Sequence, residues 1–325
     1  RSIPGAAALT ILIPAAAAAG IFVVLLRSVK ALSDAGVYLK GAGTLGAAAG
    51  VRGVVLDYER TVTTGRKRVL KVLSASAVGK KRYAAGEAND ALLELAAAAA
   101  EKQADEETRA CLRSAWGSAP DPQVLQGHNV LLGDAEMMRG SGIAIIPARE
   151  TGEILYVSCD GAFSGYIVIG DPVRAEAQEA VQELRDAGVQ EIALLAGEEQ
   201  AGAEAFAQKQ GLDEVLSVGS GAGNIREVLR DWRRRCGGGA AFVSCRDVLA
   251  DGGREADVTF AMGRKGGGTR DAVRKADAVL RTGDLRGAGL TIAEGASAVG
   301  TIRKIGLICV IAELSVLILR FVGVI

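Results

Sequence analysis

Short apolar runs alternate with segments of helical spacing over the second half of this 325-residue chain. Within 176–187, for example, apolar side chains recur every three or four residues and so share one helix face. This alternation predicts a doubly wound α/β domain, a parallel sheet with helices on both faces. The expected strands are Tyr166–Gly170, Glu191–Ala196, Val215–Val218, Ala241–Ser244, Val258–Met262 and Ala278–Leu280, with helices at Glu176–Ala187, Glu199–Gln210 and Ile225–Arg235.

Charge balance and cysteine spacing limit what the chain is expected to bind. It has 38 basic and 38 acidic residues, so no excess of positive charge favours nucleic acid as a partner. Its five cysteines are scattered and form no C-x-x-C, which favours reduced thiols over a disulfide framework or a zinc site. We therefore expect no nucleic-acid partner.

Two apolar runs lie near the two ends of the chain. Ala7–Leu26 is uncharged and about 20 residues long, enough to cross the bilayer core as a helix. Ile305–Ile325 is the second run, and basic residues flank both runs on the side of the intervening body. The positive-inside rule then predicts transmembrane helices at 1–27 and 304–325, lipid as a partner, and residues 28–303 in the cytoplasm of a multi-pass cell-membrane protein.

Two residues in these runs are candidate membrane-site residues. Pro14 interrupts the first run, and a proline there is expected to unwind the helix and free backbone carbonyls. Glu313 lies in the middle of the second run, where a carboxylate marks either a functional site or a hydrogen bond between helices. A signal peptide and a buried core helix are the alternatives for the first run, and its length and Pro14 disfavour the signal peptide.

A hydroxyl-rich turn directly follows an apolar run that ends at Asp57. In open α/β sheets, chemistry takes place just beyond the carboxyl ends of strands. A carboxylate held there can attack a phosphoryl group and form an aspartyl-phosphate. We therefore predict that Asp57 occupies the position of a nucleophile and that its strand belongs to the same sheet.

About 100 residues separate Asp57 from the other expected strands. This separation predicts a small α+β domain, 68–150, inserted between the two parts of a larger domain, 28–67 and 151–303. Elements expected inside the insert are a helix over Glu87–Ala110 and strands over Val130–Leu132 and Ile143–Ile146.

Several segments resemble signatures of the P-type cation-transporting ATPases. Asp57, Thr61 and Thr63 match the phosphorylation signature D-K-T-G-T-[LI]-T, whereas residues 58–60 depart from it. The compact insert makes the chain most similar to the heavy-metal-transporting branch, within the haloacid-dehalogenase-like superfamily. Further similar segments are Gly36–Gly41, Gly165–Arg174, Ala256–Gly263 and Ala276–Leu280.

This resemblance implies a haloacid-dehalogenase-like phosphorylation domain that uses ATP and Mg²⁺, with an inserted nucleotide-binding-like domain. The family's T-G-D triplet corresponds to 196–198, so Gly197 and Glu198 are implied catalytic residues beside Asp57 and Thr61. The magnesium candidates are Asp57 and Asp247. The candidate nucleotide contacts are Gly117 and Gly133.

Most polar groups that the family needs are replaced in this chain. The motif G-D-G-x-N-D aligns with Ser244–Leu249, so a thiol replaces the first magnesium ligand. Its Arg246 is expected to hold an anion at a helix N-terminus. The lysine of P-x-x-K aligns with Ala222, and Arg226 one helical turn later is its only candidate substitute. The "S-E-H-P" motif aligns with 104–107, and the single histidine, His128, is expected in a surface turn.

Glu59 allows a further interpretation. Soluble phosphatases of the superfamily use an acid two residues after the nucleophile as general acid and base, and Glu59 has that spacing from Asp57. The alternative is a solvated turn carboxylate that pairs with Arg60.

Three functions remain open from the sequence. The first is a P-type-ATPase-like membrane protein with weakened or lost transport and a regulatory or interaction role. The second is a fragment of an active heavy-metal pump that is phosphorylated at Asp57, and the third is a membrane-tethered phosphatase. Two spans cannot enclose a polar path through lipid, and the chain begins at Arg1. We therefore expect a companion membrane subunit or the remainder of a longer chain.

Overall fold

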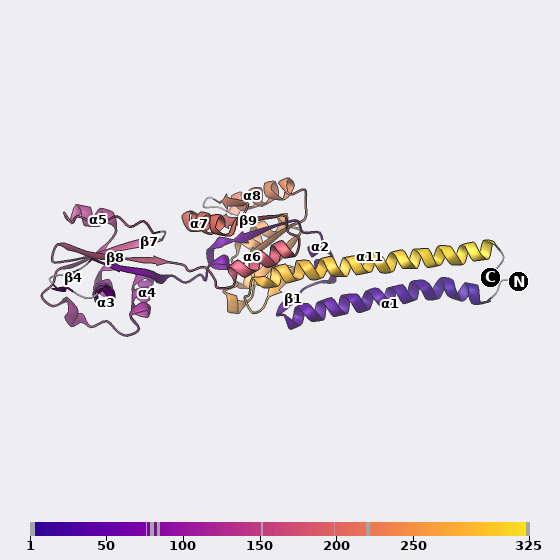
Figure 1. Ribbon diagram of the computed structural model, residues 1–325, viewed down its shortest axis with the longest axis horizontal. Coiled ribbons are helices and arrows are strands. Elements are labelled where there is room, and N and C mark those ends of the chain that lie inside the picture. Colours follow the sequence, from indigo (N-terminus) through magenta and orange to yellow (C-terminus); the bar gives the residue numbers. More distant parts are fainter. Residues whose placement is uncertain are drawn as a thin grey trace. The chain divides into compact units, whose positions relative to one another are not determined.

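The chain forms two compact units, each built around its own sheet (Figure 1). One unit comprises Arg1–Val62 and Ala175–Ile325, and the other comprises Thr63–Arg174. The computed structural model describes residues 4–75, 77–78, 81–82, 85–150, 152–197, 199–218 and 222–322.

The sheet of the first unit has seven strands in the order β1-β13-β12-β11-β2-β9-β10. All neighbouring strands pair in parallel except β1 and β13, which are antiparallel. The strand that ends at Asp57 therefore belongs to this sheet, as expected, and lies in its interior between β11 and β9. The strands are β1 (Val37–Leu39), β2 (Gly53–Asp57), β9 (Glu191–Ala196), β10 (Glu214–Ser217), β11 (Ala240–Ser244), β12 (Val258–Met262) and β13 (Ala278–Leu280).

Alternate residues of β2 enter two different cores. Val54 and Leu56 belong to one apolar cluster, which includes Ile292. Val55 belongs to another, which includes Trp232. Because successive side chains of a strand point to opposite faces, these clusters lie on opposite faces of the sheet. The predicted doubly wound α/β domain is confirmed.

The shorter helices of this unit are α2 (Ala42–Ala48), α6 (Ala177–Asp186), α7 (Gln200–Gln210), α8 (Ala222–Arg235), α9 (Val248–Gly252) and α10 (Arg270–Lys275), with helical turns at Tyr58–Val62, Gly253–Glu255 and Arg264–Gly266.

Two long helices of this unit, α1 (Pro4–Asp34) and α11 (Arg286–Phe321), pack against each other and run side by side in Figure 1. The expected boundaries at 27 and 304 differ from the structure, because α1 continues to Asp34 and the second apolar run is the last part of α11. Neither junction contains a proline to end a helix. Alpha-helix α11 is 36 residues long and so spans about 54 Å.

Among the described helices, the stretch Leu9–Asp34 is long and apolar enough to cross a membrane. The second expected span, at 305–325, does not meet this criterion of length and apolar composition within the described residues. It carries Glu313 and Arg320. Alpha-helix α1 is continuous through Pro14, so the expected unwinding at this proline is wrong.

The second unit is an α+β unit around a four-stranded antiparallel sheet, in the order β3-β8-β7-β6. Side chains from α3 and α4 form one apolar core with this sheet, including Leu92, Leu112 and Ile167. The elements are β3 (Arg68–Ser74), β4 (Ala77–Val78), β5 (Lys81–Arg82), α3 (Ala85–Gln103), α4 (Glu106–Trp116), a helical turn at Pro122–Leu125, β6 (Val130–Gly133), α5 (Ala135–Gly140), β7 (Glu153–Cys159) and β8 (Ala162–Gly170).

The insert is larger than the sequence predicted. Its C-terminal boundary lies at Arg174 rather than at 150, because β8 pairs with β3 and β7 and not with the parallel sheet. The strand expected at 166–170 is thus part of the insert. Periodicity alone does not reveal the partner of a strand, which explains the error.

Two further expectations within the insert are wrong. The helix expected over 87–110 is two helices, because the Asp105 side chain accepts a hydrogen bond from the backbone N–H of Thr108 and caps α4. The strand expected over 143–146 is irregular backbone. Pro147 directly follows it, and proline cannot donate to a strand ladder.

Candidate active site

Asp57 is the last residue of the central strand β2 and is fully buried. The neighbouring strands β11 and β9 run parallel to β2, so their carboxyl ends reach the same edge of the sheet. This edge is where ligands bind in open α/β sheets. The residues after β11 and β9 therefore form the surroundings of Asp57.

The Asp57 carboxylate is clasped by Arg246, from the turn after β11. Arg246 Nε lies 2.8 Å from Asp57 Oδ2, and Arg246 Nη2 lies 2.5 Å from Oδ1. The hydroxyl of Ser244 also donates to Oδ2, at 2.6 Å. Such a two-point contact between guanidinium and carboxylate is among the strongest charge-assisted hydrogen bonds in proteins.

Arg246 binds a second carboxylate, that of Glu59. Arg246 Nη1 lies 2.6 Å from Glu59 Oε2, while Glu59 Oε1 accepts backbone hydrogen bonds from Gly197 at 2.8 Å and Glu199 at 3.2 Å. Glu59 is 13% exposed, so it is not the solvated turn carboxylate offered as an alternative. A Cβ at Gly197 would lie 3.0 Å from both Glu59 oxygens, which explains the glycine at this position.

Electrostatics couple these three side chains. Burial raises the pKa of the Asp57 carboxyl, as does the charge of Glu59, and these effects outweigh the opposing hydrogen bonds from Arg246 and Ser244. Burial alone would lower the pKa of Arg246, but Asp57 and Glu59 raise it above its ordinary value. Arg246 therefore stays charged, and it is the main group that stabilises an ionised Asp57.

The turn after β2 is tied to the turn after β11. Arg60 adopts left-handed backbone geometry (φ 63°), and its carbonyl accepts a hydrogen bond from the Cys245 thiol at 3.2 Å. The hydroxyl of Thr61 accepts the backbone N–H of Cys245 at 2.9 Å. Burial raises the pKa of Cys245, which keeps it a neutral thiol. Thr61 thus positions the neighbouring turn.

The surroundings of Asp57 do not fit Mg²⁺. This ion requires hard oxygen ligands in near-octahedral geometry. Among the described residues, the acidic oxygens beside Asp57 are those of Glu59, and Arg246 pairs with both carboxylates. Asp247, the other candidate ligand, accepts a hydrogen bond from Thr269 at 2.5 Å. A divalent cation would face the guanidinium charge, so these residues do not form a magnesium site.

The remaining implied residues have local roles or lie outside the described part of the chain. Glu198 belongs to the latter group, as does Gly219. Gly117 ends α4 in left-handed geometry, and Gly133 packs against Met137, whose sulfur would lie 2.3 Å from an added Cβ. These roles explain both glycines without a nucleotide.

In the long helices, Glu313 lies against a small cavity of about 180 Å³, which Thr10 and Arg320 also line. Its Oε1 is buried and finds no hydrogen-bond partner among the described residues. Pro14 does not line this cavity.

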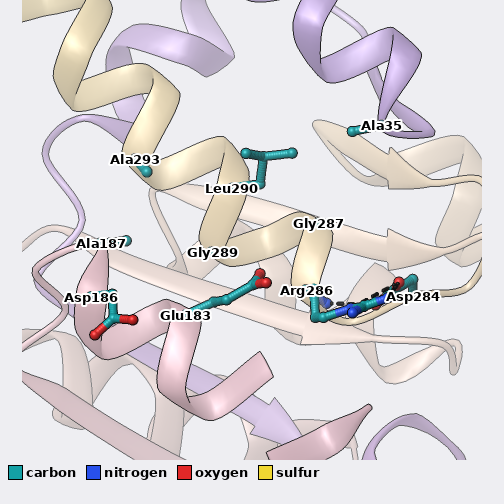
Figure 2. Close-up of a pocket in the computed structure, with 10 residues that line it drawn as sticks. All are labelled: Ala35, Glu183, Asp186, Ala187, Asp284, Arg286, Gly287, Gly289, Leu290 and Ala293. Atoms are coloured by element: carbon teal, nitrogen blue, oxygen red, sulfur yellow. Dashed lines mark hydrogen bonds and ion pairs between the residues drawn. The ribbon is translucent and has the colours of Figure 1, made fainter. Parts of the chain in front are cut away.

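A larger cavity, of about 440 Å³, lies between α6 and the start of α11 (Figure 2). Arg286 forms an ion pair with Asp284 at its margin, which lowers the pKa of Asp284. Glu183 points into it, and burial raises the pKa of this carboxyl. The cavity shares no lining residue with the Asp57 site, so it is a separate feature.

Arg246 is the functional residue whose partners were not identified from the sequence. We expected it to hold an anion at a helix N-terminus, and the anions that it binds are the carboxylates of Asp57 and Glu59. The sequence did contain a signal for this contact. Arg246 follows a strand that was expected in the same parallel sheet as the Asp57 strand, and the carboxyl ends of parallel strands meet at one edge.

Comparison with known proteins agrees with this architecture. The chain is 27% identical to the cadmium, zinc and cobalt-transporting ATPase of Bacillus subtilis over 271 residues, which cover 78% of this chain and 37% of that protein. It is 32% identical to a copper-exporting P-type ATPase of Mycobacterium tuberculosis over 259 residues, covering 75% and 33%. The chain thus spans about a third of the length of these relatives.

The fold also matches that of a solved structure. A zinc-transporting PIB-type ATPase in the E2.Pi state superposes with a TM-score of 0.72 at 20% identity, covering 92% of this chain and 50% of that one. The predicted resemblance to heavy-metal P-type ATPases is confirmed as a similarity. Residues 51–239, from two residues before the Asp57 strand to the residue before β11, match the haloacid dehalogenase-like hydrolases, and the chain belongs to that family.

Proposed function

We propose that this chain is part of a heavy-metal P-type-ATPase-like membrane protein whose ATP-driven transport is weakened or lost, leaving a regulatory or interaction role. The observation that carries this proposal is the clasp of Arg246 on Asp57 and Glu59. Phosphoryl transfer depends on positioning and charge stabilisation around the attacking oxygen. Here both oxygens of Asp57 already accept hydrogen bonds from a guanidinium.

The clasp opposes phosphorylation in two ways. A carboxylate paired at both oxygens is a weaker nucleophile, because its lone pairs are engaged. The cation beside it is also fixed to the chain, and its charge is already paired with Asp57 and Glu59. Loss of one positioned group in such sites costs about 10²–10³ in rate.

A fragment of an active pump that forms an aspartyl-phosphate at Asp57 is the second candidate. The retention of Asp57 at the end of the central strand favours it. The Arg246 side chain is 24% exposed, so it has a route away from Asp57. In this case ATP and Mg²⁺ would have to displace Arg246.

A membrane-tethered phosphatase is less well supported. A general acid and base must reach the substrate, but Glu59 is held by Arg246 and by two backbone N–H groups. All three contacts would have to break before Glu59 could transfer a proton.

For the membrane arrangement, we propose that α1 and the last part of α11 cross the membrane as an antiparallel pair, with 28–303 in the cytoplasm. Large apolar side chains on both helices are exposed, among them Ile11 at 72% and Ile308 at 66%, which supports contact with lipid. Two helices cannot enclose a polar path, so transport would need a companion subunit or more of the chain.

The test is to incubate the full chain in detergent with Mg²⁺ and ATP labelled at the γ-phosphate, with Asp57→Asn as the control. We expect no acid-stable, hydroxylamine-labile label on either protein. Label on the unsubstituted chain alone would contradict the proposal and support the pump fragment. Release of phosphate from small esters, lost in Glu59→Gln, would support the phosphatase.

A further inference from the structure

We propose that His128, Cys159 and Asp160 bind a zinc-type divalent cation in the inserted unit. One nitrogen, one sulfur and one oxygen ligand atom of these residues lie within 4.8 Å of one another. These three residues belong to a different unit from Asp57. The proposal therefore does not depend on whether Asp57 is phosphorylated.

Strand pairing brings the three residues together across about 30 positions of sequence. In the antiparallel ladder between β6 and β7, Val130 lies opposite Cys159. His128 therefore approaches Asp160, the residue after Cys159. His128 is the only histidine in a chain with five cysteines, so the meeting of the two residue types is informative.

The hairpin turn holds Asp160 in one orientation. Asp160 and Gly161 connect β7 to β8 with φ angles of 54° and 80°, the geometry of a tight two-residue hairpin. Asp160 Oδ1 accepts the backbone N–H of Asn129 at 2.9 Å, and Oδ2 lies 2.9 Å from His128 Nδ1. The carboxylate and the imidazole are thus oriented before any cation binds.

The donor set fits a borderline-soft cation. Zinc binds histidine nitrogen at about 2.0–2.1 Å and cysteine sulfur at about 2.3 Å, usually with tetrahedral geometry. Two donor atoms about 3 Å apart, such as His128 Nδ1 and Asp160 Oδ2, can share one such ion. His128 would bind the ion through Nδ1 as the neutral imidazole, with its proton on Nε2, and binding of Cys159 as a thiolate would release one proton to solvent.

The burial of the three side chains favours a site with one open position. Cys159 is buried at the edge of the apolar core that includes Val130 and Leu132. His128 and Asp160 are 42% and 28% exposed. Three protein ligands with a solvent-facing fourth position are typical of zinc sites that exchange a ligand.

The alternative is that the contact between His128 and Asp160 only closes the hairpin. Cobalt(II) distinguishes the two, because a cobalt–thiolate bond gives an intense near-ultraviolet charge-transfer band. We would titrate the full chain, purified in detergent without a polyhistidine tag, with Co²⁺ and then displace the Co²⁺ with Zn²⁺. The expected result is one equivalent of Co²⁺ per chain with the thiolate band, which Zn²⁺ abolishes.

Variants assign the ligands. We expect Cys159→Ser to abolish the thiolate band, and His128→Gln and Asp160→Asn to weaken Co²⁺ binding by at least about tenfold. Asp160→Asn is the sharpest variant, because asparagine followed by glycine also forms the tight hairpin and keeps an oxygen for the Asn129 N–H. Cys111→Ser, at another buried cysteine of the same unit, is the matched control and should bind Co²⁺ unchanged.

Two outcomes would overturn the proposal. One is the absence of a thiolate band at saturating Co²⁺ in a chain with native circular dichroism. The other is a band that survives in Asp160→Asn and His128→Gln with unchanged affinity, which would assign the thiolate to a different place in the protein.

Discussion

The two units of this protein differ in how far their ion pairs are exposed to solvent. At the edge of the parallel sheet, Asp57 is fully buried and Arg246 is 24% exposed. In the insert, Lys67, just before β3, and Glu153 of β7 form an ion pair in which the side chains are 34% and 42% exposed. The first pair lies at the carboxyl end of β2, where the turns after β2 and β11 are bonded to each other.

This contrast separates two kinds of ion pair. Removing one partner of a buried pair leaves an uncompensated charge and is strongly destabilising. Removing one partner of an exposed pair returns the other to water at little cost. The clasp around Asp57 is therefore a structural part of its unit, whereas the surface pairs of the insert are not.

The chain has one tryptophan in each unit, so the units can be followed separately. Trp232 is buried in the first unit, and Trp116 belongs to α4 in the second. A Trp116→Phe background reports unfolding of the first unit by fluorescence, and a Trp232→Phe background reports the second. The predictions below use these backgrounds.

The largest effect is expected for Arg246→Ala. Asp57 and Glu59 would remain close together without their cation, so we expect the first unit to lose about 3–5 kcal/mol of stability. Urea unfolding followed by Trp232 fluorescence measures this loss.

The control for that substitution is Arg230→Ala, in the same unit. Arg230 pairs with Glu255 at 2.8 Å, but its side chain is 56% exposed, so we expect a loss below about 1 kcal/mol. Equal losses in the two variants would remove the distinction between the buried clasp and a surface pair.

A medium effect is expected for Gly197→Ala. The added Cβ would lie 3.0 Å from both Glu59 oxygens and push this carboxylate from its backbone donors, which costs about 1–3 kcal/mol. Gly46→Ala in α2 is the matched control, because its Cβ would meet nothing within 4 Å and alanine favours a helix by about 1 kcal/mol. A neutral Gly197→Ala would mean that Glu59 is not held tightly.

The smallest effect is expected in the insert, as a dependence on pH. Hydrogen bonds from Lys71 and Tyr166 lower the pKa of Glu150 to about 2. The contribution of Glu150 to stability is thus complete above its ordinary pKa near 4.5 and is lost as the pH falls toward 2.

In the parent chain, the urea concentration at the midpoint of unfolding of the insert should fall between about pH 4.5 and 2, as measured by Trp116 fluorescence. Glu150→Gln should make this fall smaller. Glu136→Gln, at an exposed glutamate in α5, should leave that fall unchanged. If both variants behave like the parent, Glu150 makes no contribution to the pH dependence.

Much of the first unit could be predicted from short-range patterns. The runs around Asp57, Phe242 and Phe260 are apolar on both faces, as parallel strands covered on both sides require. The insert was harder. Its strand β8 has the same apolar character but pairs with β3 across about 95 residues, and no local pattern reveals that partner.

The sequence by itself determined the parallel sheet, the place of Asp57 at its carboxyl edge, the existence of an insert and an apolar N-terminal helix. These features depend on the spacing of apolar side chains along one segment, which a sequence displays directly. The tertiary structure alone decided which side chains meet: Arg246 with Asp57 and Glu59, and His128 with Cys159 and Asp160. The physical reason is that strand register brings together groups that lie far apart in sequence, and burial then determines how strongly their charges interact.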